Sequence, residues 1–305
     1  MGVKTILFTD IGNDVSSVLS LVYLATSPAV DLELVVTTSG NPVSKAWVAK
    51  TILEFLGKNT RVAIGSAEPL KGKAIKPRKY ESAGLALQEV QVLDNPIRAV
   101  LGMLSPVEDL SVRIVVNAPY TDLAKAYCCD KRLFHQKINS IYTLGELFEG
   151  KDRFHADQFN DQIAADPRAA GIIEDVLSEI PFVLVPSAFG INIPLYPEFF
   201  EKINLHHPVG VYIHKLAERS RSYSLQHGSQ KQLYRESQAV SLPHSSAVAL
   251  ALGSPRVLAS KLRQSDGAHC HAIILHPYEG ARETLEQSLQ CALTAQYQKA
   301  HPRRA

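Results

Sequence analysis

Short apolar runs rich in β-branched residues alternate along the chain with longer stretches in which apolar residues recur at helical spacing. The runs predict buried strands, and the stretches between them predict helices. The predicted strands lie at 4–10, 32–40, 61–67, 111–119, 137–145 and 181–188. The predicted helices lie at 14–27, 42–57, 95–105, 121–129 and 166–180. This alternation is typical of an α/β fold with a mainly parallel open sheet flanked by helices.

The pattern is less regular in the last third of the chain. The expected elements are helices over 206–222 and 245–253, a hairpin over 256–276 and a closing amphipathic helix over 281–300. No Gly/Ser-rich or Pro-rich tract interrupts the sequence. We therefore predict one domain over 1–305, with a small hairpin and helix at about 255–300.

Composition and charge exclude several classes of protein. Apolar residues make up 46% of the 305 residues, which is enough to bury a core and argues against disorder. Lys and Arg number 32 against 30 Asp and Glu, and no basic stripe precedes the terminal HPRRA, so we expect no nucleic-acid partner. No apolar run approaches the roughly 20 residues of a membrane span, so we expect no membrane partner either. The four cysteines suit neither a disulfide framework nor a metal site, and the first residues do not resemble a signal peptide. We therefore expect a cytoplasmic location.

The polar residues that follow the strands are the candidates for function, because ligands bind at the carboxyl ends of the strands in open parallel sheets. Asp10 ends the first strand, and Asp14 follows it after a turn at Gly12. Two carboxylates around one turn suit a hard cation or a sugar diol. Asp14 is explained equally well as the cap of the next helix.

Several other polar segments follow later strands or precede later helices, and each is weak evidence alone. Taken in order, they resemble the inosine-uridine preferring nucleoside hydrolase family over roughly 3–255. The family motifs D-x-D-P-G-x-D-D, G-N, P-L-T-N-[LI]-A, E-F-N, D-P-E-A-A, L-V-P-L-D and H-D-P-x-A-V-A are similar to Phe8–Val15, Gly40-Asn41, Pro119–Ala124, Gln158–Asn160, Asp166–Ala170, Leu184–Ala188 and His244–Ala249. The resemblance implies the nucleoside hydrolase-like fold.

The resemblance also implies a metal site, from which this sequence departs. In the family, three carboxylates and a threonine carbonyl bind one Ca²⁺, which holds the ribose diol and the attacking water. The corresponding positions here are Asp10, Val15, Ser245 and the carbonyl of Thr121. Only Asp10 supplies a carboxylate, and Ca²⁺ affinity depends on the number and charge of its oxygen ligands. We therefore expect no tightly bound cofactor, and at most weak Ca²⁺ binding by Asp10 and Thr121.

The sugar-binding part of the family motif is better preserved. The resemblance assigns Asp14 to the ribose 2′-hydroxyl and Asn41 and Asn160 to other ribose contacts. Gln158 replaces a glutamate that would bind hydroxyls, and His244 matches a position that assists the leaving group. In the first motif, Phe8 and Ile11 replace an aspartate and a proline. The residues of a segment that covers the pocket in relatives are explained equally well as a solvated surface; they are Tyr223, His227, Tyr234 and Arg235.

These observations leave two interpretations open. In the first, the protein binds a ribonucleoside or ribosylated ligand at the strand ends, with its calcium-dependent N-ribohydrolase activity lost or strongly reduced. In the second, it is a slow or metal-altered N-ribohydrolase in which Asp10 is the general base and His244 protonates the departing base. Whether the protein is an enzyme is therefore open. The family also implies a homodimer or homotetramer.

Overall fold

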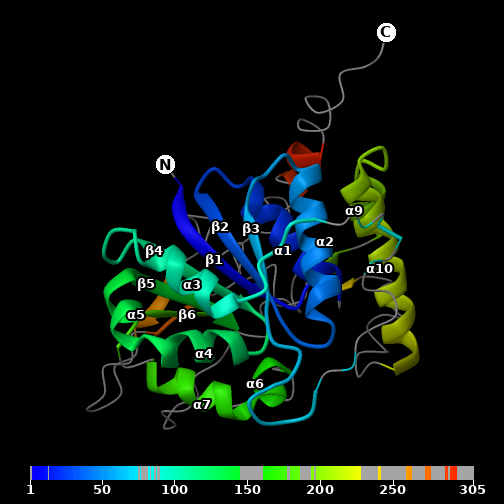
Figure 1. Ribbon diagram of the computed structural model, residues 1–305. Helices are drawn as coiled ribbons and strands as arrows, with labels where there is room; N and C mark the ends of the chain where they lie inside the picture. The colour runs from blue at the N-terminus through cyan, green and yellow to red at the C-terminus, as the bar shows by residue number, and fades with distance from the viewer. Residues whose placement is uncertain are drawn as a thin grey trace.

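The computed structural model describes most of the first two thirds of the chain and parts of the last third (Figure 1). The described residues are 2–12, 14–74, 76, 82, 84–85, 87, 90–144, 161–176, 179–185, 194–195, 197–227, 240–241, 259–262, 272–275, 286–287 and 289–293. The expected helix at 245–253 lies outside them. Within the described residues, no helix is long and apolar enough to cross a membrane.

An eight-stranded sheet forms the centre of the fold, in the order β3-β2-β1-β4-β5-β6-β10-β9. All neighbouring strands pair in parallel except β9 and β10, which are antiparallel. The strands are β1 Val3–Thr9, β2 Val30–Thr37, β3 Arg61–Ile64, β4 Val112–Asn117, β5 Ile138–Leu144, β6 Phe182–Val185, β9 Ala259–Leu262 and β10 Ala272–Leu275. A separate pair joins β7, Pro194–Leu195, to β8, Val240–Ser241. The predicted mainly parallel sheet is confirmed, and the predicted hairpin, β9–β10, extends this sheet beside β6.

Helices cover both faces of the sheet (Figure 1). The helices α1 Val15–Thr26, α2 Pro42–Phe55, α9 Pro197–Glu201 and α10 Pro208–His227 contribute to one buried cluster. The helices α3 Pro96–Leu104, α4 Thr121–Cys129, α5 Lys131–Lys137, α6 Asp161–Ala165 and α7 Pro167–Val176 contribute to a second cluster on the other face. The helical pattern predicted all of the longer helices in these ranges, but it missed α5, which follows α4 after a single residue.

The strand period divides β1 between these two clusters. Leu7 belongs to the α1 side, whereas Ile6 and Phe8 belong to the α3 and α4 side. All three are buried, since successive side chains in a strand point to opposite faces of the sheet. Phe8 therefore fills the core and not the strand-end site, although it occupies the position of a family aspartate.

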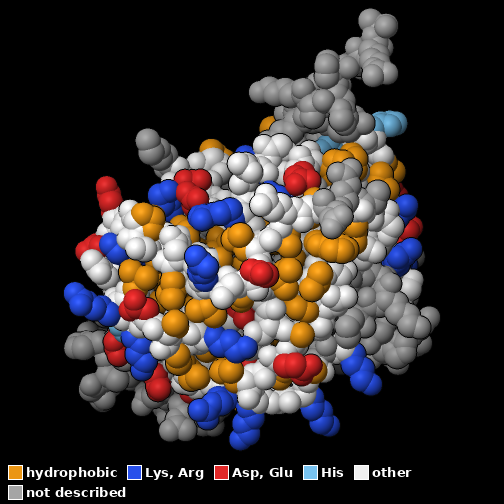
Figure 2. Space-filling model, viewed as in Figure 1, with side chains coloured by type: hydrophobic (Ala, Val, Ile, Leu, Met, Phe, Trp, Pro, Cys, Tyr) orange, Lys and Arg blue, Asp and Glu red, His pale blue; other side chains and the backbone are white. Residues whose placement is uncertain are grey.

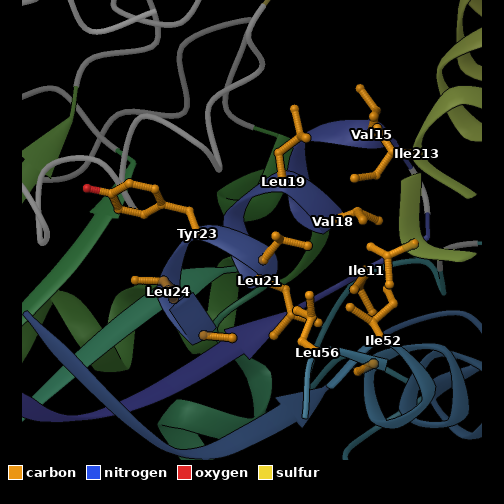
Figure 3. Packing of buried hydrophobic residues seen from close by; sticks show 14 of the residues in the cluster. Ile11, Val15, Val18, Leu19, Leu21, Tyr23, Leu24, Ile52, Leu56 and Ile213 are labelled. Atoms are coloured by element: carbon orange, nitrogen blue, oxygen red, sulfur yellow. The ribbon is translucent and has the colours of Figure 1, made fainter. Parts of the chain in front are cut away.

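Helix α1 is buried along nearly its whole length, from Val15 to Ala25. It lies between the sheet and a layer that includes α10, which explains why its sequence is apolar on more than one side. Figure 3 shows Val15 and Ile11 in the same packed cluster as Ile213 of α10. The start of α1 is therefore part of the core.

Replacing Phe8 with alanine tests its place in the core. Phe8 is 1% exposed, so we expect Phe8→Ala to lower the free energy of unfolding by about 3–5 kcal/mol in urea denaturation. Leu205→Ala is the control, because Leu205 is 50% exposed and should change stability by only about 0.5 kcal/mol. Similar losses in both variants would contradict this packing.

Candidate functional site

Four of the predicted site residues follow three neighbouring parallel strands, β2, β1 and β4, at one edge of the sheet. Asp10 follows β1, Asn41 follows β2, and Thr121 begins the helix after β4. Asp14 caps α1 by accepting a hydrogen bond from the Ser17 N–H at 3.1 Å. Asp10 and Asp14 are half-buried and Asn41 is exposed. The fold thus brings these polar groups to the edge at which open parallel sheets bind ligands.

Asn41 is presented by a strained turn. Ser39 and Gly40 both have φ of 63°, a left-handed conformation that glycine adopts freely and serine does not. The Ser39 N–H donates to the Ser66 carbonyl at 2.7 Å, which holds the turn against the end of β3. Asn41 then caps α2 through a hydrogen bond from the Ser44 N–H to its Oδ1 atom at 3.1 Å. Asn41 is therefore placed by the turn before it and by the helix after it.

Lys45 supports the same turn from inside the protein. Its side chain is fully buried, and Nζ donates to the Thr38 carbonyl and to Ser39 Oγ, both at 3.3 Å. Burying an ammonium group costs free energy unless polar partners surround it, so this lysine is unusual in a helix. Sequence reasoning missed it. The signal was present, because position 45 lies on the buried stripe of α2 together with Ala49 and Ile52.

Asp166 joins three segments beneath the site. Its carboxylate accepts hydrogen bonds from Thr121 Oγ1 at 2.6 Å, Leu70 N at 2.6 Å, Lys71 N at 3.2 Å and Ala169 N at 3.1 Å. Asp166 is fully buried, and these donors come from the starts of α4 and α7 and from the segment after β3. The sequence indicated a motif match at Asp166 but no role. The structure shows that it fixes the Thr121 side chain.

A second polar cluster ties β3 to α4. Asp122 is buried and accepts hydrogen bonds from Ser66 N at 2.9 Å and Ser66 Oγ at 2.7 Å. Lys125 Nζ donates to Ser66 Oγ at 2.6 Å. Gly65 is required here, because a Cβ atom at this position would collide with the Thr37 carbonyl and the Asp122 carboxylate. These contacts hold the ends of β2 and β3 against the helix that carries Thr121.

Buried polar groups also lie at the ends of β1 and β4. Thr9 and Asn117 are register partners, and neither Thr9 Oγ1 nor Asn117 Oδ1 has a hydrogen-bond partner among the described residues. Asn117 Nδ2 donates to Ser20 Oγ at 2.7 Å. Tyr120 is fully buried beside Thr121 and bonds Thr143 Oγ1 at 2.8 Å, and burial raises the pKa of its hydroxyl far above the usual value. Tyr120 therefore stays neutral, and the interior below the edge is polar but uncharged.

The described residues do not complete the calcium site of the family. Val15, at the position of one carboxylate ligand, is fully buried in the apolar cluster of α1 and α10 and has no donor atom. Asp10 is the carboxylate that remains, beside the backbone of Thr121. In the part of the chain that the structure describes, no three His, Cys, Asp or Glu side chains are grouped to hold a metal ion.

The other predicted site residues lie outside the described residues. These are Gln158, Asn160, His244, Ser245, Tyr234 and Arg235. Tyr223 and His227 lie in α10. The roles that the resemblance assigned to these residues stay predictions.

Comparison with known proteins agrees with this fold and edge. Residues 5–297 match the family model of inosine-uridine preferring nucleoside hydrolases. The chain belongs to this family. No curated protein matches its sequence.

Solved structures show the same fold at low sequence identity. The type III effector protein XopQ, solved in complex with adenosine diphosphate ribose, has a TM-score of 0.77 and 21% identity over 96% of this chain and 95% of its own. The plant nucleoside hydrolase PpNRh1 has a TM-score of 0.74 and 18% identity over 97% and 100% of the two chains. The purine-preferring ribonucleoside hydrolase from Gardnerella vaginalis has a TM-score of 0.76 and 14% identity over 97% and 99%.

Removing the Asp166 carboxylate tests its role beneath the site. Asp166→Ala leaves four buried or partly buried donors without their acceptor, so we expect the free energy of unfolding to fall by about 3 kcal/mol or more. Asp130→Ala is the control, since Asp130 is an exposed cap that accepts from Leu133 N and should cost about 1 kcal/mol. Equal losses in urea denaturation would show that Asp166 is only a helix cap.

Proposed function

We propose that this nucleoside hydrolase family member binds a ribonucleoside or another ribosylated ligand at the carboxyl edge of its sheet. We further propose that its calcium-dependent N-ribohydrolase activity is lost or strongly reduced. One observation carries the proposal. Val15, which stands where the family has a metal-binding carboxylate, is fully buried in the core, while Asp10, Asp14 and Asn41 remain at the edge.

The loss of activity follows from electrostatics. Cleavage of an N-glycosidic bond passes through an oxocarbenium-like transition state, and preorganised charge is usually the largest catalytic contribution. Asp10 and the Thr121 carbonyl offer few of the 6–8 oxygen ligands that Ca²⁺ takes. A cation held this weakly would neither fix the ribose diol nor activate water well.

The capacity to bind a riboside rests on different residues. Asp14 and Asn41 both have oxygen atoms in helix caps at the site edge, where they are held in place. Gln158, Asn160 and His244 are proposed to add further polar contacts, as the family resemblance implies. The similar fold of XopQ, solved with adenosine diphosphate ribose, supports a ribosylated small molecule as the ligand class. The homodimer or homotetramer and the cytoplasmic location stay predictions.

Release of nitrophenol from p-nitrophenyl riboside tests the proposed loss of activity. At high protein concentration, with and without added Ca²⁺, we expect release no faster than in the protein-free reaction. Isothermal titration of the same protein with adenosine and inosine should detect binding, because the polar edge is retained.

Two matched variants make this assay decisive. If release is observed, disappears in Asp10→Asn and persists in Asp31→Asn, the protein is an N-ribohydrolase and the proposed loss of activity is wrong. Asp31 is a suitable control because it lies at the start of β2, at the opposite edge of the sheet. Absence of binding to every riboside would refute the binding proposal.

Calcium titration tests the metal site separately. By calorimetry we expect no saturable Ca²⁺ binding in the micromolar range, since the described residues supply one carboxylate at the site. A Kd in the low micromolar range or tighter that is abolished by Asp10→Ala would contradict this prediction. Retention of such binding in Asp10→Ala would place the ion elsewhere.

A further inference from the structure

A basic segment follows β3 and runs beside the candidate site. Lys71, Lys73 and Lys76 are exposed, and within the described part of the chain none of them has an ion pair. Figure 2 shows Lys and Arg side chains along the lower edge of the molecule, where Figure 1 draws this cyan segment beside α6. Unpaired like charges repel one another, so their clustering on one segment costs free energy unless an anion binds there.

The segment is held rigidly against the site. The N–H groups of Leu70 and Lys71 donate to the Asp166 carboxylate, which also binds Thr121. Gly72 has φ of 140°, and a Cβ atom there would lie 2.6 Å from the Ala165 carbonyl oxygen. Because the backbone is tied at both places, the lysines project from a fixed position beside Thr121 and not from a free loop.

A small hollow lies between this segment and the strand ends. Its lining includes Lys73 and Glu68 together with four hydroxyl-bearing residues, which are Thr38, Ser39, Ser66 and Thr121. Thr38 N donates to the Thr9 carbonyl, one residue before Asp10, so the hollow lies at the same edge as the candidate ribose site. A group attached to a bound ribose would therefore reach it.

Positive charge exceeds negative charge around the hollow. Lys73 lines it, Lys125 donates to the lining residue Ser66, and Lys45 donates to Thr38 and Ser39. The carboxylates are Glu68 in the lining and Asp122 behind Ser66. Three ammonium groups thus face two carboxylates, and Lys71 and Lys76 add charge nearby. Lysine and hydroxyl donors are the groups that bind phosphate oxygens.

We propose that this hollow and the adjoining lysines bind the phosphate of a phosphorylated riboside, so that the protein prefers such ligands to plain nucleosides. The inference rests on the proposed riboside binding at the same edge. A phosphate monoester and a diphosphate share the chemistry that the lysines recognise.

Isothermal titration with adenosine, AMP and ADP-ribose tests this preference, with inorganic phosphate as a separate arm. At low salt we expect AMP or ADP-ribose to bind roughly fivefold or more tightly than adenosine. The preference should shrink as salt is raised, because exposed charges are screened. The double variant Lys71→Gln/Lys73→Gln should remove most of it while leaving adenosine affinity unchanged. Glu68→Gln should increase it, because this substitution removes the opposing carboxylate.

Lys131→Gln is the matched control, since Lys131 is exposed on α5 and stacks over Tyr127 away from the hollow. The inference is overturned if adenosine binds as tightly as AMP and ADP-ribose, or if Lys131→Gln reduces the preference as much as the double variant does. Equal binding of inorganic phosphate and AMP, or tighter binding of a single-stranded oligonucleotide, would also overturn it. In the first of these outcomes riboside binding still stands, whereas failure of all three ribosides to bind would refute the proposed function itself.

Discussion

The buried carboxylate of Asp166 holds together the edge of the sheet on which the candidate site depends. It accepts hydrogen bonds from the Thr121 hydroxyl, from the N–H groups of Leu70 and Lys71, and from the start of α7. These donors come from segments that are distant in the sequence, and a buried carboxylate is tolerated only when such donors surround it. The helix that carries Thr121 and the basic segment after β3 therefore keep a fixed position relative to each other.

The divergence from the nucleoside hydrolase motif is explained by packing on the two faces of the sheet. Phe8 and Val15 replace family carboxylates, and each is buried in a different apolar cluster. They strengthen the core that positions the strand ends, while the polar residues Asp10, Asp14 and Asn41 stay at the edge. The exchange removes negative charge from the former metal site without leaving an unpaired polar group at either position.

Sequence reasoning predicted most of the sheet and part of the site. The strand and helix periods were strong because both faces of the sheet are buried, and the caps Asp14 and Asn41 follow from their residue types before helices. Lys45 was missed although it lies on the apolar stripe of α2, because a charged residue in such a stripe is usually exposed. Helix α5 was missed because one residue separates it from α4.

The sequence by itself determined the family, the alternation of strands and helices, and which acidic positions of the family motif are replaced. Those properties depend on the identity and local spacing of residues. Only the tertiary structure decided that Phe8 faces away from the site, that Asp166 binds Thr121, and that Lys73 lies beside the strand ends. Such relations join segments separated by tens of residues, and local periodicity carries no information about which distant donors and acceptors meet.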